Sequence, residues 1–220
     1  MTEREIAERL AALYDRRSLQ GYVRWKVRTD PAYAAVRDVL RGRSRPVIDV
    51  GCGVGLLPLY LREHGHDAPM TGIDFDQRKI DVARMAARDY EGIDFIVGDA
   101  RAALPRDHDV VLLDLLHYFD SASQQTILAN AATAAGSDGV VVIRQGIRDG
   151  SWRHRLTAFV DGLARVFRWM KAERINLPAR DEVEAAFKDF DAEVRPLWGK
   201  MPYNSYLFVL KPRATARRPE

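Results

Sequence analysis

A glycine-rich segment at residues 47–55 carries the residue types and spacing that point most directly to chemistry. The apolar run Val47 to Val50 leads into glycine at positions 51, 53 and 55, and an amphipathic stretch follows at 56–64. Glycine permits positive φ and has no Cβ, so a ligand can lie against the backbone. The amide groups that open the following helix would then point toward the bound group. We therefore predict a strand, a ligand-binding loop and a helix.

Acidic side chains near this loop indicate which ligand it holds. Asp49 lies two residues before the first glycine, where its carboxylate would repel a pyrophosphate but can receive an ammonium group. Asp74 ends the apolar segment 70–74, and an acid at the end of a second strand can accept both hydroxyls of a ribose. Leu56 stands where the dinucleotide-binding pattern requires a small residue, which disfavours NAD(P).

The pattern Asp49-x-Gly51-x-Gly53-x-Gly55 resembles the first motif of class I S-adenosylmethionine-dependent methyltransferases. Three later segments match that family in order, namely 70–74, 93–97 followed by Asp99 and Ala100, and 109–113 followed by Asp114. The resemblance covers 47–144 firmly, the terminal hairpin moderately and the first 43 residues loosely. It implies S-adenosylmethionine as cofactor and S-adenosylhomocysteine as product.

The resemblance also implies which residues hold the cofactor. Asp74 would accept the ribose hydroxyls, Phe75 would pack against the adenine face, and Asp99 with the Ala100 amide would recognise the adenine edge. The basic, aromatic segment 18–31 ends at Asp30-Pro31, a predicted helix start. The segment either covers the site, with Tyr22, Arg24 and Lys26 as candidates to reach it and Lys26 or Arg24 pairing with the methionine carboxylate, or is a solvated connector. The expected cofactor-binding set is Lys26, Asp49, Gly51, Cys52, Gly53, Asp74, Phe75, Asp99, Ala100, Asp114 and Leu115.

His117 is the candidate catalytic residue. Methyl transfer from a sulfonium requires alignment, exclusion of water and removal of a proton where the nucleophile carries one. His117 lies three residues beyond Asp114, and the near-neutral pKa of an unperturbed histidine suits a general base. The alternative is that His117 only shapes the pocket or holds a neighbouring loop. Four further side chains either orient an acceptor or pack at strand ends: Tyr118, Tyr203, Asn204 and Tyr206.

Several acceptor classes lack their expected residues. Asp114-Leu-Leu-His117 stands where adenine-methylating enzymes carry Asp/Asn-Pro-Pro-Tyr/Phe, so no nucleic acid is expected as a partner. No paired glutamates of the protein-arginine enzymes occur there, and 144–147 supplies no cluster of metal ligands. Cys52 is the single cysteine and lies in the glycine loop, which argues against covalent cytosine methylation.

These exclusions leave a small-molecule or carrier-bound substrate. The leading hypothesis is O-methylation without a metal, as in bacterial secondary metabolism. Two alternatives stay open: a non-catalytic adenosylmethionine-binding or scaffold protein, and, less favoured, an NAD(P)-dependent oxidoreductase.

The length of 220 residues, with 47% hydrophobic and 30% charged, suits a single domain. A charged N-terminus without a signal-peptide core predicts a cytoplasmic protein. Alternating elements predict an α/β fold with a mostly parallel sheet and helices on both faces. The family resemblance implies a Rossmann-like, doubly wound sheet of seven strands with an antiparallel terminal hairpin strand. Helices are expected at 55–64, 76–89 and 121–134, a fifth strand at 139–144, and the hairpin strands at 192–198 and 205–211. The expected parts are an N-terminal helical cap (1–43), a cofactor-binding core (44–145), a helical lid (146–190), a terminal hairpin (191–211) and a tail (212–220).

The segment 151–174 is basic, with six Lys or Arg against two acids. Its apolar residues recur at helical spacing, with basic residues on the opposite side. We interpret it as a lid helix that packs on the core, or as a surface for a membrane or an acidic partner. The acceptor and the oligomeric state cannot be read from the sequence.

Overall fold

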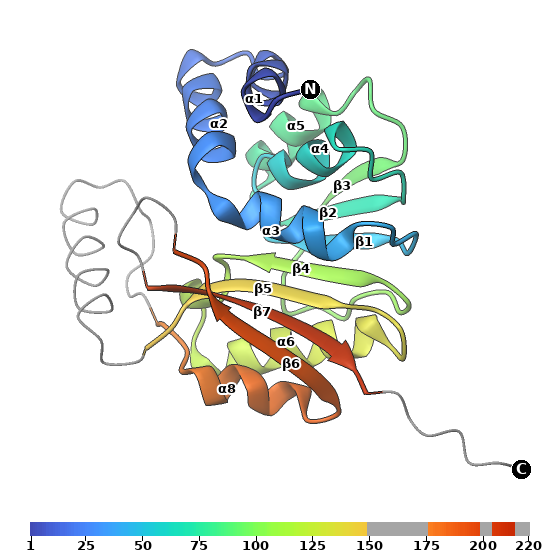
Figure 1. Cartoon of the computed structure of the whole chain (residues 1–220), viewed down its shortest axis with the longest axis vertical. Coiled ribbons are helices and arrows are strands. Elements are labelled where there is room, and N and C mark those ends of the chain that lie inside the picture. The colour runs from blue at the N-terminus through green and yellow to red at the C-terminus, as the bar shows by residue number, and fades with distance from the viewer. Residues whose placement is uncertain (149–175, 199–203, 214–220) are drawn as a thin grey trace, which may run out of the picture.

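A computed structural model describes residues 1–148, 176–198 and 204–213. The predicted lid or partner helix at 151–174 lies outside the described residues, as does Tyr203. Seven strands form one sheet: β1 (Val47–Val50), β2 (Met70–Asp74), β3 (Ile93–Val97), β4 (Asp109–Leu113), β5 (Val141–Gly146), β6 (Phe190–Pro196) and β7 (Ser205–Pro212). Their order is β3-β2-β1-β4-β5-β7-β6 (Figure 1). Strands β1 to β5 are parallel, and β7 runs antiparallel between β5 and β6, which confirms the predicted fold.

Helices cover both faces of this sheet (Figure 1). One apolar cluster joins the sheet to α1 (Glu3–Ala12), α2 (Arg17–Thr29), α3 (Pro31–Leu40), α4 (Leu56–Glu63) and α5 (Gln77–Ala86). A second joins it to α6 (Ser121–Ala135), α8 (Arg180–Glu184) and the short 3-10 helices η1 (Leu116–Tyr118) and η2 (Ala185–Phe187). Strand residues alternate between the clusters, as Val47 and Ile48 do, because successive side chains point to opposite faces.

Short polar side chains set the helix boundaries. Asp30 ends α2 and also caps α3, where its carboxylate accepts a hydrogen bond from the Ala32 amide at 2.9 Å and Pro31 takes the first helical position. The predicted helix start at Asp30-Pro31 is thereby confirmed, and most of segment 18–31 is helix α2. Strand β5 begins two residues later than expected because Gly139 lies in the turn after α6, where its amide donates to the Ala135 carbonyl at 2.8 Å.

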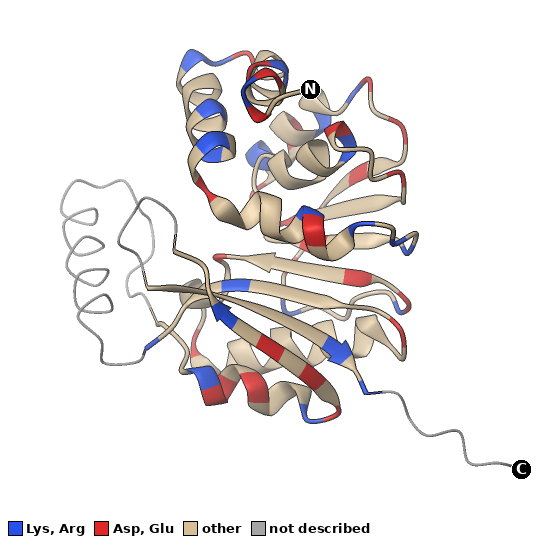
Figure 2. Cartoon of the chain, in the orientation of Figure 1, with Lys and Arg blue, Asp and Glu red and all other residues tan. Residues whose placement is uncertain are grey.

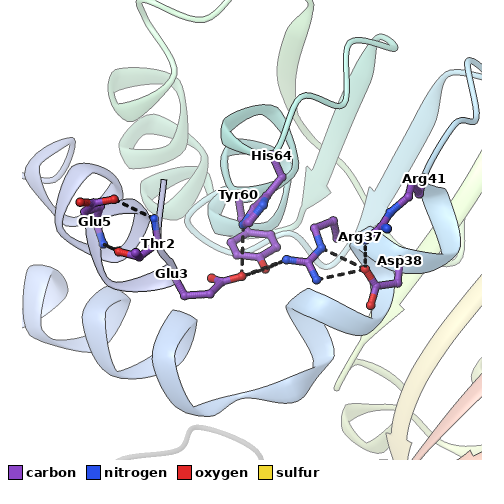
Figure 3. Close-up of polar contacts among 8 residues, drawn as sticks. All are labelled: Thr2, Glu3, Glu5, Arg37, Asp38, Arg41, Tyr60 and His64. Carbon is purple, nitrogen blue, oxygen red and sulfur yellow. Dashed lines mark hydrogen bonds and ion pairs between the residues drawn. The ribbon is translucent and has the colours of Figure 1, made fainter.

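A buried tyrosine and two basic side chains attach α1 to the rest of the domain (Figure 3). The Glu3 carboxylate accepts hydrogen bonds from Arg37 at 2.9 Å and from the Tyr60 hydroxyl at 3.0 Å, and His64 Nε2 lies 3.4 Å away. One acid on α1 therefore joins α3 and α4. Among the described residues, no helix has the length and apolar character needed to cross a membrane.

Candidate functional site

The loop after β1 is shaped by its glycines. Gly51 and Gly53 adopt φ of 80° and 57°, in the left-handed region that other residues rarely enter. A Cβ at Gly51 would lie 2.8 Å from Leu115, whereas one at Gly53 would meet nothing within 4 Å. Gly51 is therefore required by a close neighbour, and Gly53 leaves open space beside the backbone.

A cavity of about 150 Å³ opens between this loop, α2, α3 and the carboxyl ends of β1 and β4. The strands after β1 are added on one side of it (β2, β3) and then on the other (β4, β5), so the strand order reverses between β1 and β4. Parallel α/β sheets bind ligands at such a switch point. Six members of the expected cofactor set line the cavity: Lys26, Asp49, Gly51, Cys52, Gly53 and Asp114. Tyr22, a candidate from segment 18–31, also lines it. Sequence reasoning did not identify Asp30 or Tyr33 as cofactor-binding residues, although both line the cavity.

Asp49 places an unsatisfied carboxyl group in this cavity. Its side chain is 4% exposed, and no hydrogen bond to it is found among residues 1–148, 176–198 and 204–213. Burial, and secondarily the neighbouring Asp74, raise its pKa to about 7. A buried carboxylate without a partner is costly, so the position suits a ligand that brings a positive charge.

Asp74 connects the end of β2 to the glycine loop. Its carboxylate accepts hydrogen bonds from the Gly53 amide at 3.0 Å and the Asp76 amide at 2.9 Å. The side chain thus holds the loop in place, and each carboxylate oxygen keeps a further lone pair for a ligand hydroxyl.

The expected adenine-binding residues lie outside the cavity. Phe75 is 77% exposed, with Lys79 Nζ 5.7 Å from its ring centroid. Asp99 pairs with Arg101 at 2.6 Å, and this partner lowers the pKa of Asp99 to about 2. Ala100 is buried beside them. The Leu115 side chain packs against Gly51 and so supports the glycine loop. The adenine contacts of Phe75, Asp99 and Ala100 stay predictions.

Lys26 reaches the cavity from α2, which carries several Lys and Arg side chains and no acid (Figure 2). Its Nζ pairs with Asp30 at 2.6 Å. Burial would raise the pKa of Asp30, but nearby Arg144 and Lys26 lower it overall. Arg24, the other candidate for the methionine carboxylate, instead pairs with Glu8 at 2.6 Å, where both side chains are well exposed. The structure therefore favours Lys26.

His117 follows β4 in η1 and contacts the end of β5. Its Nδ1 lies 3.1 Å from Gln145 Nε2, and its ring centroid lies 4.1 Å from that of Tyr118. Burial lowers its pKa to about 4. Nearby, Asp114 has a φ of 54° and forms an ion pair with Arg144. Within the described residues, no group of three or more His, Cys, Asp or Glu has a geometry suited to a metal ion.

The glycine loop and the strand ends around it match a known family. A model described as a methyltransferase domain matches residues 47–139. The match covers the glycine loop and strands β1 to β4, so this core of the chain is similar to a methyltransferase domain. The buried Asp49 carboxyl beside the open Gly53 backbone would suit the ammonium end of S-adenosylmethionine, the cofactor that the sequence motifs predict.

Three solved structures share the fold of this chain at low identity. The pyocyanin biosynthetic protein PhzM has a TM-score of 0.68 and 20% identity, covering 89% of this chain and 58% of that chain. Magnesium protoporphyrin IX methyltransferase (ChlM) from Synechocystis PCC 6803 with bound S-adenosylhomocysteine has a TM-score of 0.67 and 17% identity, covering 94% and 97%. Mitomycin 7-O-methyltransferase MmcR has a TM-score of 0.63 and 17% identity, covering 96% and 54%. The chain thus spans little more than half of PhzM and MmcR. No curated protein sequence matches it.

Proposed function

We propose that this protein is a methyltransferase that moves the methyl group of S-adenosylmethionine to an oxygen of a small organic or carrier-bound acceptor, without a metal. The observation that carries the proposal is the buried Asp49 carboxyl, which has no described partner and lines a cavity beside the glycine loop. The similar structures include mitomycin 7-O-methyltransferase MmcR, which supports oxygen as the acceptor atom.

The cofactor, when bound, supplies a methyl group made electrophilic by its sulfonium. Asp49 would receive the ammonium and Lys26 the carboxylate of the methionine end, both from positions that line the cavity. Asp74 would receive the ribose hydroxyls at the next strand end, while it keeps the loop amide of Gly53 in place. These contacts fix the direction of the methyl group, which is the main requirement of an in-line displacement.

Calorimetric titration with S-adenosylmethionine and S-adenosylhomocysteine tests the cofactor site. We expect micromolar binding to the wild type, and binding weakened about tenfold or more in Asp49→Asn and Asp74→Ala. Asp94→Asn is the control, because that aspartate is exposed on β3. Folded wild-type protein that binds neither compound would refute the proposal.

An acceptor screen then tests the reaction itself. Production of S-adenosylhomocysteine with small phenols, carboxylic acids or carrier-bound acids would demonstrate methyl transfer. Binding of the cofactor without product for any acceptor would instead favour the non-catalytic alternative. A shift of the melting temperature with NAD(P) alone would favour the oxidoreductase.

A further inference from the structure

The side chain of Gln145 on β5 lies within hydrogen-bond distance of the His117 ring. The Gln145 side chain is completely buried, and its amide makes three hydrogen bonds. Oε1 accepts from the Leu116 amide at 3.2 Å, while Nε2 donates to the Gly146 carbonyl at 3.3 Å and faces His117 Nδ1 at 3.1 Å. Two of these three partners are backbone groups whose donor or acceptor character cannot change.

The backbone partners determine which way the Gln145 amide points. A reversed amide would place its NH₂ against the Leu116 N–H and its oxygen against the Gly146 carbonyl, which loses two hydrogen bonds in a buried site. Nε2 therefore faces His117, and Nδ1 of the imidazole must accept. A neutral imidazole that accepts at Nδ1 carries its proton on Nε2.

This tautomer determines whether His117 can act as a base. His117 lies three residues after Asp114, which lines the cofactor cavity, and is not itself among the lining residues. No hydrogen bond to its Nε2 is found in the part of the chain that the structure describes. The nitrogen left for a ligand is thus a donor, and a donor cannot remove a proton.

The carboxylates beside this edge are already engaged. Asp114 is paired with Arg144, and Asp30 is paired with Lys26 at 2.6 Å. Asp49 lies at the glycine loop, where the ammonium of the cofactor is expected. Within the described residues, none of these groups is placed as an uncommitted base for an acceptor hydroxyl.

We propose that His117 donates a hydrogen bond from Nε2 to the acceptor, with Gln145 as the positioning residue, and that the acceptor is an oxygen acid ionised at neutral pH. A carboxylate or an acidic enol or phenol has this chemistry. The inference rests on the proposed function and replaces the hypothesis of His117 as a base. A lone pair of the acceptor oxyanion forms the O–C bond, the C–S bond breaks, and its electron pair stays on sulfur. No proton has to be moved.

Nitrogen-15 NMR of the S-adenosylhomocysteine complex tests the tautomer directly. The His117 resonances are assigned by their loss in His117→Gln, and at neutral pH we expect a protonated Nε2 and an unprotonated Nδ1. In Gln145→Glu a carboxylate oxygen replaces the amide NH₂, so the proton should move to Nδ1 and the two nitrogens should exchange their shifts. If that variant does not fold, Gln145→Met should instead make the Nδ1–H form detectable.

A wild-type His117 that is protonated on Nδ1 would overturn the inference, even where S-adenosylhomocysteine binds and the proposed function stands. Failure of the wild type to bind this compound would instead count against the proposed function.

The acceptors that turn over supply an independent readout. Carboxylic acids and acidic phenols should react, and matched aliphatic alcohols should not. His117→Gln keeps an N–H donor and should stay within about tenfold of wild-type kcat, whereas His117→Leu should lose about 100-fold or more. Equal losses in the two variants, or efficient methylation of an alcohol, would restore the base hypothesis.

Discussion

Acidification should weaken cofactor binding through Asp49. Burial raises the pKa of this carboxyl to about 7 in the unliganded protein. Only the ionised form attracts an ammonium group, so ligand binding must first remove the proton from protonated molecules. The apparent affinity for S-adenosylhomocysteine should therefore fall about tenfold between about pH 8 and pH 6, and about tenfold again by pH 5. Each tenfold step corresponds to about 1.4 kcal/mol of binding free energy.

Calorimetry at several pH values measures this effect. Near pH 6, titrations in buffers of different ionisation enthalpy should reveal the release of about one proton per bound ligand. Asp49→Asn should bind more weakly at neutral pH and should lose the pH dependence. 5′-Methylthioadenosine lacks the amino acid end, so its binding to the wild type should not show this pH dependence.

An affinity for S-adenosylhomocysteine that stays constant from pH 8 to pH 5 would refute this reasoning. The same conclusion would follow if the pH dependence persisted in Asp49→Asn, since another group would then be titrating.

Three further predictions concern stability. The pKa of Asp49 is higher in the folded than in the unfolded protein, so the contribution of this carboxyl to stability is complete below the unfolded pKa and is lost as pH rises through about 7. Asp49→Asn should therefore stabilise the unliganded protein at pH 8. Urea titrations should show a gain of at most about 4 kcal/mol in the free energy of unfolding. An unchanged midpoint would contradict the raised pKa. Gly51→Ala should cost about 1 to 2 kcal/mol from its positive φ alone, and more from the approach to Leu115, so the loss should be smaller in a Leu115→Ala background. Equal losses in both backgrounds would show that the contact is unimportant. Glu3→Gln should lower the melting temperature by weakening its bonds to Arg37 and Tyr60, at a cost of about 1 kcal/mol, while the exposed Glu8→Gln should have little effect. Similar shifts for the two variants would argue against a specific role of Glu3.

The order of strands and helices was predictable because it depends on local patterns. Apolar runs that end in glycine or an acid identified the parallel strands, and the observed bounds of the hairpin strands lie within two residues of the expected ones. The antiparallel place of β7 came from the family resemblance and is confirmed. The predicted start of β5 at Gly139 was two residues too early, because the hydrogen bond from the Gly139 amide to the last residue of α6 is visible only in three dimensions.

The chemistry of the candidate site depended on pairs of residues far apart in the chain. The sequence identified Asp49 and His117, but their ionisation and tautomer follow from burial and from Gln145 on another strand. Asp30 was recognised as a helix start and not as the partner of Lys26 in the cavity. Such contacts are fixed by tertiary packing, which a linear pattern does not specify.

The contact between Gly51 and Leu115 has a consequence for how the family motif evolves. Gly51 belongs to the motif that indicates nucleotide recognition, and it is also where Leu115, in the loop after β4, contacts the glycine loop. The two positions should therefore change together during divergence, with a smaller residue at 115 wherever 51 is not glycine. A sequence comparison that scores the motif alone would mistake such a compensated relative for a protein that has lost its cofactor.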